Sequence, residues 1–343
     1  MSREKKISII IPTRNRARFL ADTLASLKAA AKKYPTEIII IDNGSTDNTR
    51  EISIQFINTS SLPCRYIYEP TPGLHVGRNL GAQLAQGEIL AYLDDDVFVD
   101  PDWLTGIQDA FTNYPELTLL GGPCIPHWEG QPPQWILDLK YPSSDGGWVL
   151  SQLSLLDLGY QKLAPCSPWH VFGCNFIIRK SVLFAAGGFH PDGMPEHLLR
   201  YRGDGESYIS QYILDNKLLS LYHPACKIRH RVPEKRLSRA YIDYIVIRNI
   251  YSQAYMECRR TNFAFIPLLT LLTRLGWRTL KTGILFLLRQ TQTSADVRHT
   301  FLLFWRCLLH SLSPNMRAWI CQPSYFKEDP CPYNQASISK RLL

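Results

Sequence analysis

Short apolar runs alternate with segments of helical spacing through the first third of the chain. The apolar runs are rich in Ile and Leu and predict buried strands at residues 7–11, 37–41, 64–68, 89–93 and 117–121. Between them, apolar side chains recur at helical spacing and predict helices at residues 17–33, 46–56, 74–85 and 102–113. This alternation is typical of an α/β fold with a Rossmann-like, mostly parallel, doubly wound sheet and flanking helices.

The helix expected at residues 74–85 carries glycines four residues apart, at Gly73, Gly77 and Gly81. Such spacing can mark a helix-pairing face in membranes, but Arg78 and Asn79 make this segment too polar for that. We expect these glycines to let the helix pack closely against the sheet.

The middle of the chain, residues 123–168, is rich in Pro, Trp and Gly and predicts long loops across the edge of the sheet. Such loops can supply an aromatic wall for an acceptor, or can simply pack on one another. Beyond them the pattern predicts strands at residues 170–179 and 226–232, the first interrupted at Gly173, and helices at residues 181–186 and 207–216.

From residue 239 onward the pattern becomes helical, which predicts an α/β domain over residues 1–255 and a helical, basic and apolar region over residues 256–343. The apolar segments at 263–288 and 301–309 are too charged or too short to make a clean bilayer span. Basic residues set among Leu, Phe and Trp are typical of amphipathic helices at a membrane surface. A packed helical subdomain or a dimer interface is the alternative.

The net charge of +8 is concentrated in the C-terminal third. Residues 227–289 hold 13 Lys and Arg and 3 Asp and Glu, an excess of 13 − 3 = +10, so the rest of the chain sums to −2. A basic segment can face anionic lipid, nucleic acid or a phosphorylated substrate. Because its charges alternate with Leu, Ile and Phe, we expect lipid contact or packing and no nucleic-acid partner.

The 9 cysteines are scattered, odd in number and without a C-x-x-C pair, which favours reduced thiols in a cytosolic compartment. The basic N-terminus runs directly into a strand-like segment, so the sequence shows no signal peptide.

Polar clusters follow three of the expected strands, at residues 13–16, 42–45 and 94–96. The last is a run of carboxylates, Asp94, Asp95 and Asp96, of which the first and third point to one side if the backbone stays extended. Paired carboxylates of this kind suit Mg²⁺ or Mn²⁺, ions that commonly hold a phosphorylated substrate as well. Since strand ends in an open α/β sheet form ligand sites, the convergence favours a functional site over a solvated acidic turn.

Several motifs in order resemble the family-2 glycosyltransferases over about residues 5–250. They are Ile-Ile-Ile-Pro-Thr-Arg-Asn-Arg at 9–16, Ile-Asp-Asn-Gly-Ser-Thr-Asp at 41–47, Gly-Arg-Asn-Leu-Gly at 77–81 and Leu-Asp-Asp-Asp at 93–96. The resemblance implies the GT-A fold and transfer of a sugar from a nucleotide diphosphate, usually with inversion. The last motif resembles the family's metal-binding DXD motif.

The resemblance also implies roles for individual residues. The nucleotide-sugar donor would be bound by Pro12, Thr13, Arg14, Asp42, Arg78, Asp94, Asp95 and Asn175. A Mn²⁺ or Mg²⁺ cofactor would be held by Asp96, Asp94 and His230. The base that deprotonates the acceptor hydroxyl would be Asp204, with Glu206 as its rival, because Gly203 replaces the acid that usually leads this motif.

The resemblance and the charge pattern together predict a metal-dependent glycosyltransferase at the cytoplasmic face of a membrane, with a glycan or lipid-linked acceptor. A UDP-sugar is the default donor because it is the commonest donor in the family that the sequence resembles. The Q-x-x-R-W motif of processive synthases is absent from the sequence, which favours single additions. A nucleotidyltransferase is the alternative, although the loop at residues 13–16 lacks the glycine such enzymes usually carry. A non-catalytic sugar-nucleotide-binding scaffold is a third reading, which the intact acidic residues disfavour.

Overall fold

The computed structural model describes residues 6–30, 34–143, 145–287, 294–322 and 325–326. The chain forms two compact units, Met1–Phe189 with Glu206–Ile242, and His190–Gly205 with Asp243–Leu343. The domain boundary expected after residue 255 falls within a continuous helix, α8 (Arg239–Thr261). The division into a catalytic domain and a C-terminal region therefore stays a prediction.

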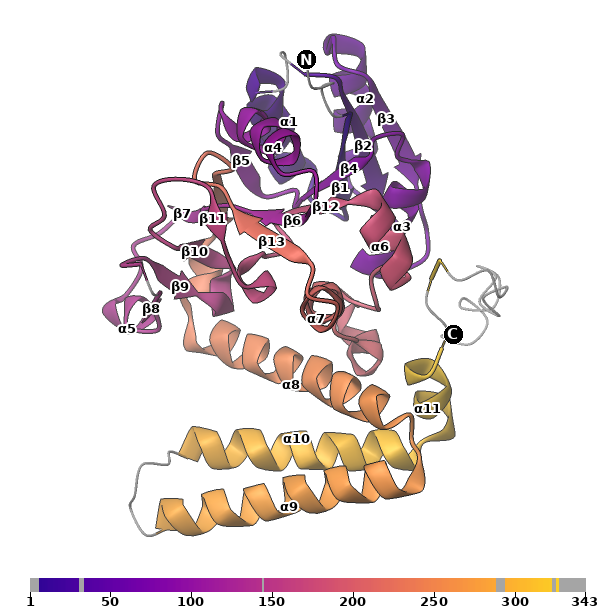
Figure 1. The fold of residues 1–343 in the computed structure, drawn as a ribbon, viewed down its shortest axis with the longest axis vertical. Helices are drawn as coiled ribbons and strands as arrows, with labels where there is room; N and C mark the ends of the chain where they lie inside the picture. Colours follow the sequence, from indigo (N-terminus) through magenta and orange to yellow (C-terminus); the bar gives the residue numbers. More distant parts are fainter. Residues whose placement is uncertain (1–5, 31–33, 144, 288–293, 323–324, 327–343) are drawn as a thin grey trace. The chain divides into compact units, whose positions relative to one another are not determined.

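The first unit contains the mostly parallel sheet with flanking helices that the sequence predicts (Figure 1). Its strands, in spatial order, are β11 (Ala164–Pro165), β13 (Leu219–Tyr222), β6 (Leu117–Gly121), β12 (Asn175–Arg179), β4 (Ile89–Leu93), β1 (Ile7–Thr13), β2 (Thr36–Asp42) and β3 (Cys64–Tyr68). Strands β1, β2 and β4 are buried along their whole length, which explains their uninterrupted apolar runs.

One strand departs from the expected alternation. β12 inserts between β4 and β6 and pairs antiparallel with both.

The helices that alternate with the early strands are α1 (Ala17–Ala30), α2 (Thr49–Thr59), α3 (Leu74–Leu84) and α4 (Trp103–Asn113). The expected extension of α1 to residue 33 lies outside the described residues.

Helix α3 packs against β1 and β2 through its glycines, as the spacing predicts. A Cβ at Gly77 would lie 3.3 Å from Pro12 Cβ, and one at Gly81 would meet the Ile10 side chain at overlapping distance. No larger residue fits at Gly81 unless the helix moves away from the sheet.

Replacing Gly81 with alanine should therefore destabilise the fold by about 1–3 kcal/mol, because the added methyl group overpacks the contact with Ile10. Gly283 is the matched control, since a Cβ there would meet no atom within 4 Å. Gly283→Ala should stabilise its helix by about 0.5–1 kcal/mol, the usual gain of alanine over glycine. Denaturant unfolding of both variants tests this, and equal shifts of one sign would contradict it.

Most strands of a second sheet lie within residues 123–168, for which the sequence predicted only loops, so that prediction is wrong; the strand expected at residues 226–232 is part of the same sheet. Its strands, in spatial order, are β5 (Val97–Val99), β14 (Ile228–Val232), β7 (Cys124–Trp128), β10 (Leu155–Asp157), β9 (Trp148–Leu150) and β8 (Tyr141–Pro142). Most of these strands are too short to show a two-residue period. The tryptophans Trp128, Trp135 and Trp148 pack around the buried side chains of Ile136 and Leu150.

Three short helices complete the first unit, α5 (Gln134–Leu137), α6 (Lys180–Ala186) and α7 (Glu206–Asp215). α6 ends at Gly187, whose φ of 92° is left-handed, as its Gly-Gly sequence predicts.

The second unit is helical, as the pattern predicts, and its long helices are α8, α9 (Phe265–Leu287) and α10 (Ser294–Leu312), followed by α11 (Pro314–Ile320). α9 and α10 run side by side (Figure 1). The core of this unit includes Tyr255, Leu271, Leu303 and Trp319. Among the described residues, no helix combines the length and apolarity that crossing a bilayer requires. The eight cysteines of the described residues are free; Cys331 lies outside them.

Candidate functional site

The turn Asp94–Asp96 joins the two sheets of the first unit. The chain leaves the first sheet at Leu93, passes through the three carboxylates, and enters the second sheet at Val97. There β5 pairs antiparallel with β14, which places His230 opposite Val97. Strand pairing therefore brings a histidine more than a hundred positions downstream to the acidic turn.

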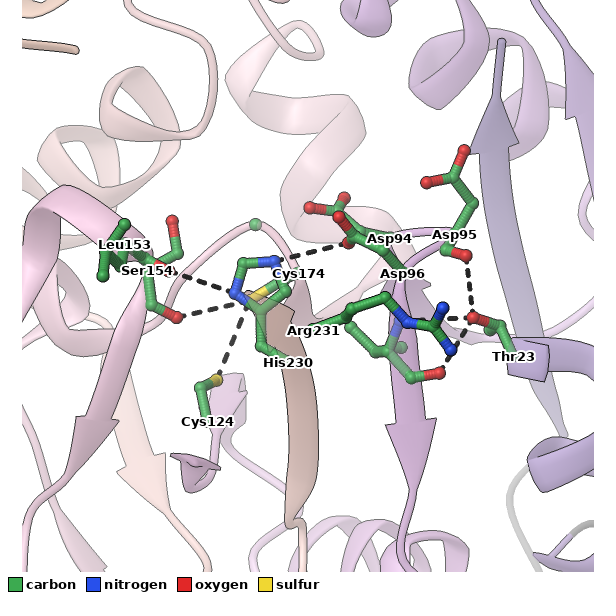
Figure 2. A network of polar contacts seen from close by, with 12 residues as sticks. Thr23, Asp94, Asp95, Asp96, Cys124, Leu153, Ser154, Cys174, His230 and Arg231 are labelled. Atoms are coloured by element: carbon green, nitrogen blue, oxygen red, sulfur yellow. Dashed lines mark hydrogen bonds and ion pairs between the residues drawn. The ribbon is translucent and has the colours of Figure 1, made fainter. Parts of the chain in front are cut away.

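Both carboxylate oxygens of Asp96 are engaged by basic side chains. Its Oδ2 accepts from Arg16 Nη1 at 2.7 Å and from Arg236 Nη2 at 3.0 Å. Its Oδ1 lies 3.3 Å from His230 Nε2, and His230 Nδ1 lies 3.1 Å from the Leu153 carbonyl oxygen; Figure 2 shows the imidazole between these partners. Asp96 is thus a buried carboxylate with three cationic neighbours.

The charges around Asp96 and His230 set the pKa values of these two side chains. Burial alone would raise the pKa of Asp96, but His230, Arg16 and Arg236 lower it well below its usual value. Burial alone would lower the pKa of His230, but the Asp96 carboxylate outweighs burial and raises it above its usual value. The pair is therefore ionised at neutral pH, with the imidazole protonated.

Asp95 and Asp96 share Arg16 as a partner. An extended backbone would have pointed these two carboxylates to opposite sides. Its Oδ2 accepts from the Thr13 hydroxyl at 2.7 Å and its Oδ1 from Arg16 Nη1 at 3.0 Å. The hydroxyl of Thr23 donates to the carbonyls of Asp95 and Val97, which holds the tight turn (Figure 2). Because the backbone turns at this point, Asp95 and Asp96 both face Arg16, and the assumption of alternating sides is wrong.

Asp94 belongs to a different cluster, centred on the buried Arg78. Arg78 Nη2 lies 3.5 Å from Asp94 Oδ1 and donates to the Gly173 carbonyl at 3.1 Å. Arg78 Nη1 donates to Glu206 Oε2 at 3.1 Å. Asp94 and Glu206 keep about a third of their side chains exposed, 32% and 31%. Arg78 thus brings two solvent-facing carboxylates together beside the acidic turn.

Asp42 lies at the end of β2, where the sequence predicted it. Its Oδ1 accepts from the Ser45 backbone N–H at 2.8 Å, and its Oδ2 accepts from the Tyr66 hydroxyl at 2.7 Å. Burial raises the pKa of Tyr66, and the Asp42 carboxylate raises it further, so the hydroxyl remains a donor. Asp42 therefore shapes the turn after β2 and anchors it to β3.

Three other predicted donor-site residues have different surroundings. The buried Asn175 side chain accepts from Trp103 Nε1 at 2.9 Å and donates to the Cys226 carbonyl at 2.8 Å, which supports a structural role. Pro12 is buried in β1 against Gly77, whereas Arg14 is exposed in the loop after that strand. Their roles in donor binding stay predictions.

Asp204 lies in the second unit, where its Oδ1 is 2.8 Å from His190 Nδ1 and the pair is buried. Burial lowers the pKa of His190, and the opposing effect of Asp204 does not restore it. A neutral imidazole therefore orients this carboxylate.

The side chains that could act as metal ligands at the acidic turn fit a divalent cation only in part. Within the described residues, no group of three or more His, Cys, Asp or Glu side chains is placed to hold a metal ion. Mg²⁺ commonly binds through one or two carboxylates together with substrate phosphates, so such a group is not required. Asp94 fits this mode because it faces solvent, whereas Asp96 and the protonated His230 are engaged with each other.

Sequence reasoning missed Arg16, Tyr66 and Arg236 as members of the site. Arg16 stands in the polar loop at residues 13–16, so its position after a strand was a usable signal. Tyr66 lies inside an expected strand, and Arg236 lies 140 positions from Asp96. For neither residue did the neighbouring sequence indicate a place in the site.

Comparisons with known proteins identify the family and the fold of the chain. The sequence profile of the family described as Glycosyl transferase family 2 matches residues 8–184. Among curated proteins, the chain is similar to a glucosyl-dolichyl phosphate glucuronosyltransferase from Haloferax volcanii, with 27% identity over 271 residues, 74% of this chain and 77% of that protein. It is also similar to a chondroitin synthase from Escherichia coli, with 36% identity over 117 residues, 34% of this chain but only 17% of that protein.

Among solved structures, the chain resembles a mannosyltransferase from Pyrobaculum calidifontis in complex with GDP-Man and Mn²⁺. The TM-score is 0.50 with 16% identity, and the match covers 93% of this chain and 74% of that one. At this identity the likeness establishes the GT-A fold, as the motifs predicted.

Proposed function

Because this chain belongs to glycosyl transferase family 2 and is a glycosyltransferase, we propose that it is a metal-dependent, inverting enzyme that uses a nucleotide-diphosphate sugar. The acceptor is a hydroxyl of a glycan or of a lipid-linked sugar. The similarity to a protein named for a dolichyl phosphate substrate supports a lipid-linked acceptor. A UDP-sugar is the donor to test first, with GDP-mannose second because a solved relative of the same fold holds it.

One observation carries this proposal: Thr13, Asp42 and Asp94 stand at or directly after the carboxyl ends of the parallel neighbours β1, β2 and β4, and Asp94 lies beside Arg78. This edge is where open α/β sheets bind nucleotides. Asp94 would hold the cation together with the diphosphate, and Asp96 would join it on leaving one of its basic partners. A bound cation neutralises the charge that develops on the leaving diphosphate.

Charged groups of the chain itself support the leaving group as well. Arg16, Arg236 and the protonated His230 surround Asp96 and bring positive charge to the acidic turn. Asp204 is proposed as the base because its motif position matches the family pattern, while one oxygen of Glu206 is occupied by Arg78. We place the enzyme at the cytoplasmic face of a membrane, which the C-terminal third contacts.

Calorimetric titration tests the proposal directly. The purified chain is titrated with UDP, GDP and their sugars, with and without Mn²⁺, beside the Asp94→Asn variant. We expect one nucleotide to bind only in the presence of the metal and to bind more weakly to the variant. A folded protein that binds none of them under any metal condition would contradict the donor assignment.

Asp42 should contribute to recognition of the nucleotide base. Asp42→Ala is expected to weaken binding of the nucleotide by about tenfold or more, because a hydrogen bond to a charged group contributes about 1.5–3 kcal/mol. Tyr66→Phe is the control, since it removes the hydroxyl that donates to Asp42 but leaves the carboxylate in place. If both variants lose affinity equally, Asp42 acts by shaping the turn.

A further inference from the structure

Helix α9 of the second unit has apolar side chains on two opposite faces. Leu271 and Leu275 are buried in the core of that unit. The other face is exposed along the helix, with Trp277 at 69% and Leu287 at 78% exposure. We call this face the α9 stripe; its members are Leu269, Trp277, Leu280, Ile284 and Leu287. Their spacing places them in one line along the helix, on the side away from Leu271.

Helix α10 repeats this arrangement. Leu303 and Cys307 are buried, while the exposed apolar side chains are spaced by three or four positions. The exposed side chains are Phe301, Trp305, Leu309 and Leu312. Both helices of the hairpin therefore present large apolar groups, tryptophan included, that the second unit leaves uncovered.

Helix α9 carries basic side chains near the α9 stripe and carries no acidic side chain. Arg274, Arg278 and Lys281 are exposed and follow one another at helical spacing along one flank of the helix, between the stripe and the buried face. The sequence contains no Asp or Glu from residue 258 to residue 295. Arg274 pairs with Glu257 at 3.1 Å, whereas no carboxylate of the described chain lies within ion-pair distance of Arg278 or Lys281.

This charge pattern decides between the partners that an apolar face can take. A second copy of the chain in a twofold dimer would bring an identical acid-free, basic face against the first, with like charges opposed. A membrane with anionic headgroups complements both features, since tryptophan and leucine enter the headgroup boundary while arginine and lysine meet phosphates. We propose that the α9 stripe, together with Arg278 and Lys281, docks on an anionic lipid bilayer. This inference rests on the proposed membrane contact of the C-terminal third and specifies its surface and lipid chemistry.

Vesicle flotation of the full chain tests the docking surface. The vesicles contain phosphatidylcholine alone or phosphatidylcholine mixed with phosphatidylglycerol. We expect binding to the mixed vesicles that weakens as salt is added, because surface attraction is screened. Two double variants, Trp277→Ser with Leu280→Ser and Arg278→Glu with Lys281→Glu, should each bind at least about tenfold more weakly. The first removes apolar side chains that enter the headgroup boundary, and the second reverses charges that attract anionic lipid.

Leu214→Ser and Lys217→Glu are matched controls, because both residues are exposed and belong to the first unit, Leu214 in α7 and Lys217 two positions after it. They should bind vesicles as the unaltered chain does. Equal binding to both kinds of vesicle, or binding to neither, would overturn the proposal. So would a stable dimer that dissociates in the Trp277→Ser, Leu280→Ser variant, since a second copy would then occupy the stripe.

Nucleotide titration of the same samples separates this inference from the proposed function. Variants in the stripe should bind nucleotide with unchanged affinity, which also shows that they are folded. Vesicle binding without any nucleotide binding would contradict the donor assignment alone. Nucleotide binding without vesicle binding would contradict the docking surface alone.

Discussion

Asp94→Asn is expected to lower kcat/KM for sugar transfer by about 10²–10³-fold, the usual loss when one group that stabilises developing charge is removed. Asp94 is the carboxylate of the acidic turn that keeps about a third of its side chain exposed, and Arg78 Nη2 lies at the long distance of 3.5 Å from its Oδ1. An asparagine keeps the shape but carries no charge for a cation. Release of nucleoside diphosphate at several Mn²⁺ concentrations measures the effect, and the loss should appear largely as a higher metal requirement.

Asp100→Asn is the matched control for this change. Asp100 is part of the same chain segment but pairs with Lys227 at 3.1 Å outside the acidic turn. It should leave kcat/KM within about twofold, since an exposed ion pair contributes little. Equal losses in the two variants would show that the charge of Asp94 has no special role.

Asp96 is a poorer first choice for this experiment. Asp96→Asn would leave Arg16, Arg236 and His230 without their shared carboxylate. Breaking a buried ion pair in this way typically costs about 3–5 kcal/mol of stability. A loss of activity in that variant could reflect a loss of stability, so its thermal unfolding has to be measured beside its activity.

Asp204→Asn is expected to lower kcat by about 10²–10⁴-fold while the Kd for the nucleotide sugar stays the same, because only proton transfer from the acceptor is lost. The amide oxygen of asparagine can still accept from His190 Nδ1, so the local contact survives. Single-turnover transfer and calorimetry on the same preparation separate the two quantities.

Glu206→Gln is the paired variant and should behave differently. Glu206 Oε2 accepts from Arg78, which also contacts Asp94, so its loss should disturb donor binding more than kcat. If Glu206→Gln abolishes turnover with unchanged donor affinity while Asp204→Asn stays active, the role of base passes to Glu206. Circular dichroism of both variants ensures that neither result reflects unfolding.

The contrast between these two carboxylates illustrates how far motif reasoning reaches. The motif places Asp204 and Glu206 two positions apart and cannot separate their roles. The structure gives them different partners, a buried histidine for the first and a buried arginine for the second. Asn175 makes the same point, because its motif position implied a ligand while its amide connects Trp103 to Cys226.

Local pattern alone was sufficient for the α/β class, for most strands and helices of the first sheet, and for the positions of Asp42 and Asp94–Asp96 at strand ends. A strand that is buried on both faces has a continuous apolar run in the sequence. The first polar residue after such a run marks the end of the strand. The antiparallel insertion of β12, the second sheet and the basic partners of Asp96 were decided by the tertiary structure. Several of them depend on pairing between segments far apart in the chain, such as Asn175 with Leu93, His230 with Val97 and Arg236 with Asp96. Periodicity carries no information about which distant segments will pair.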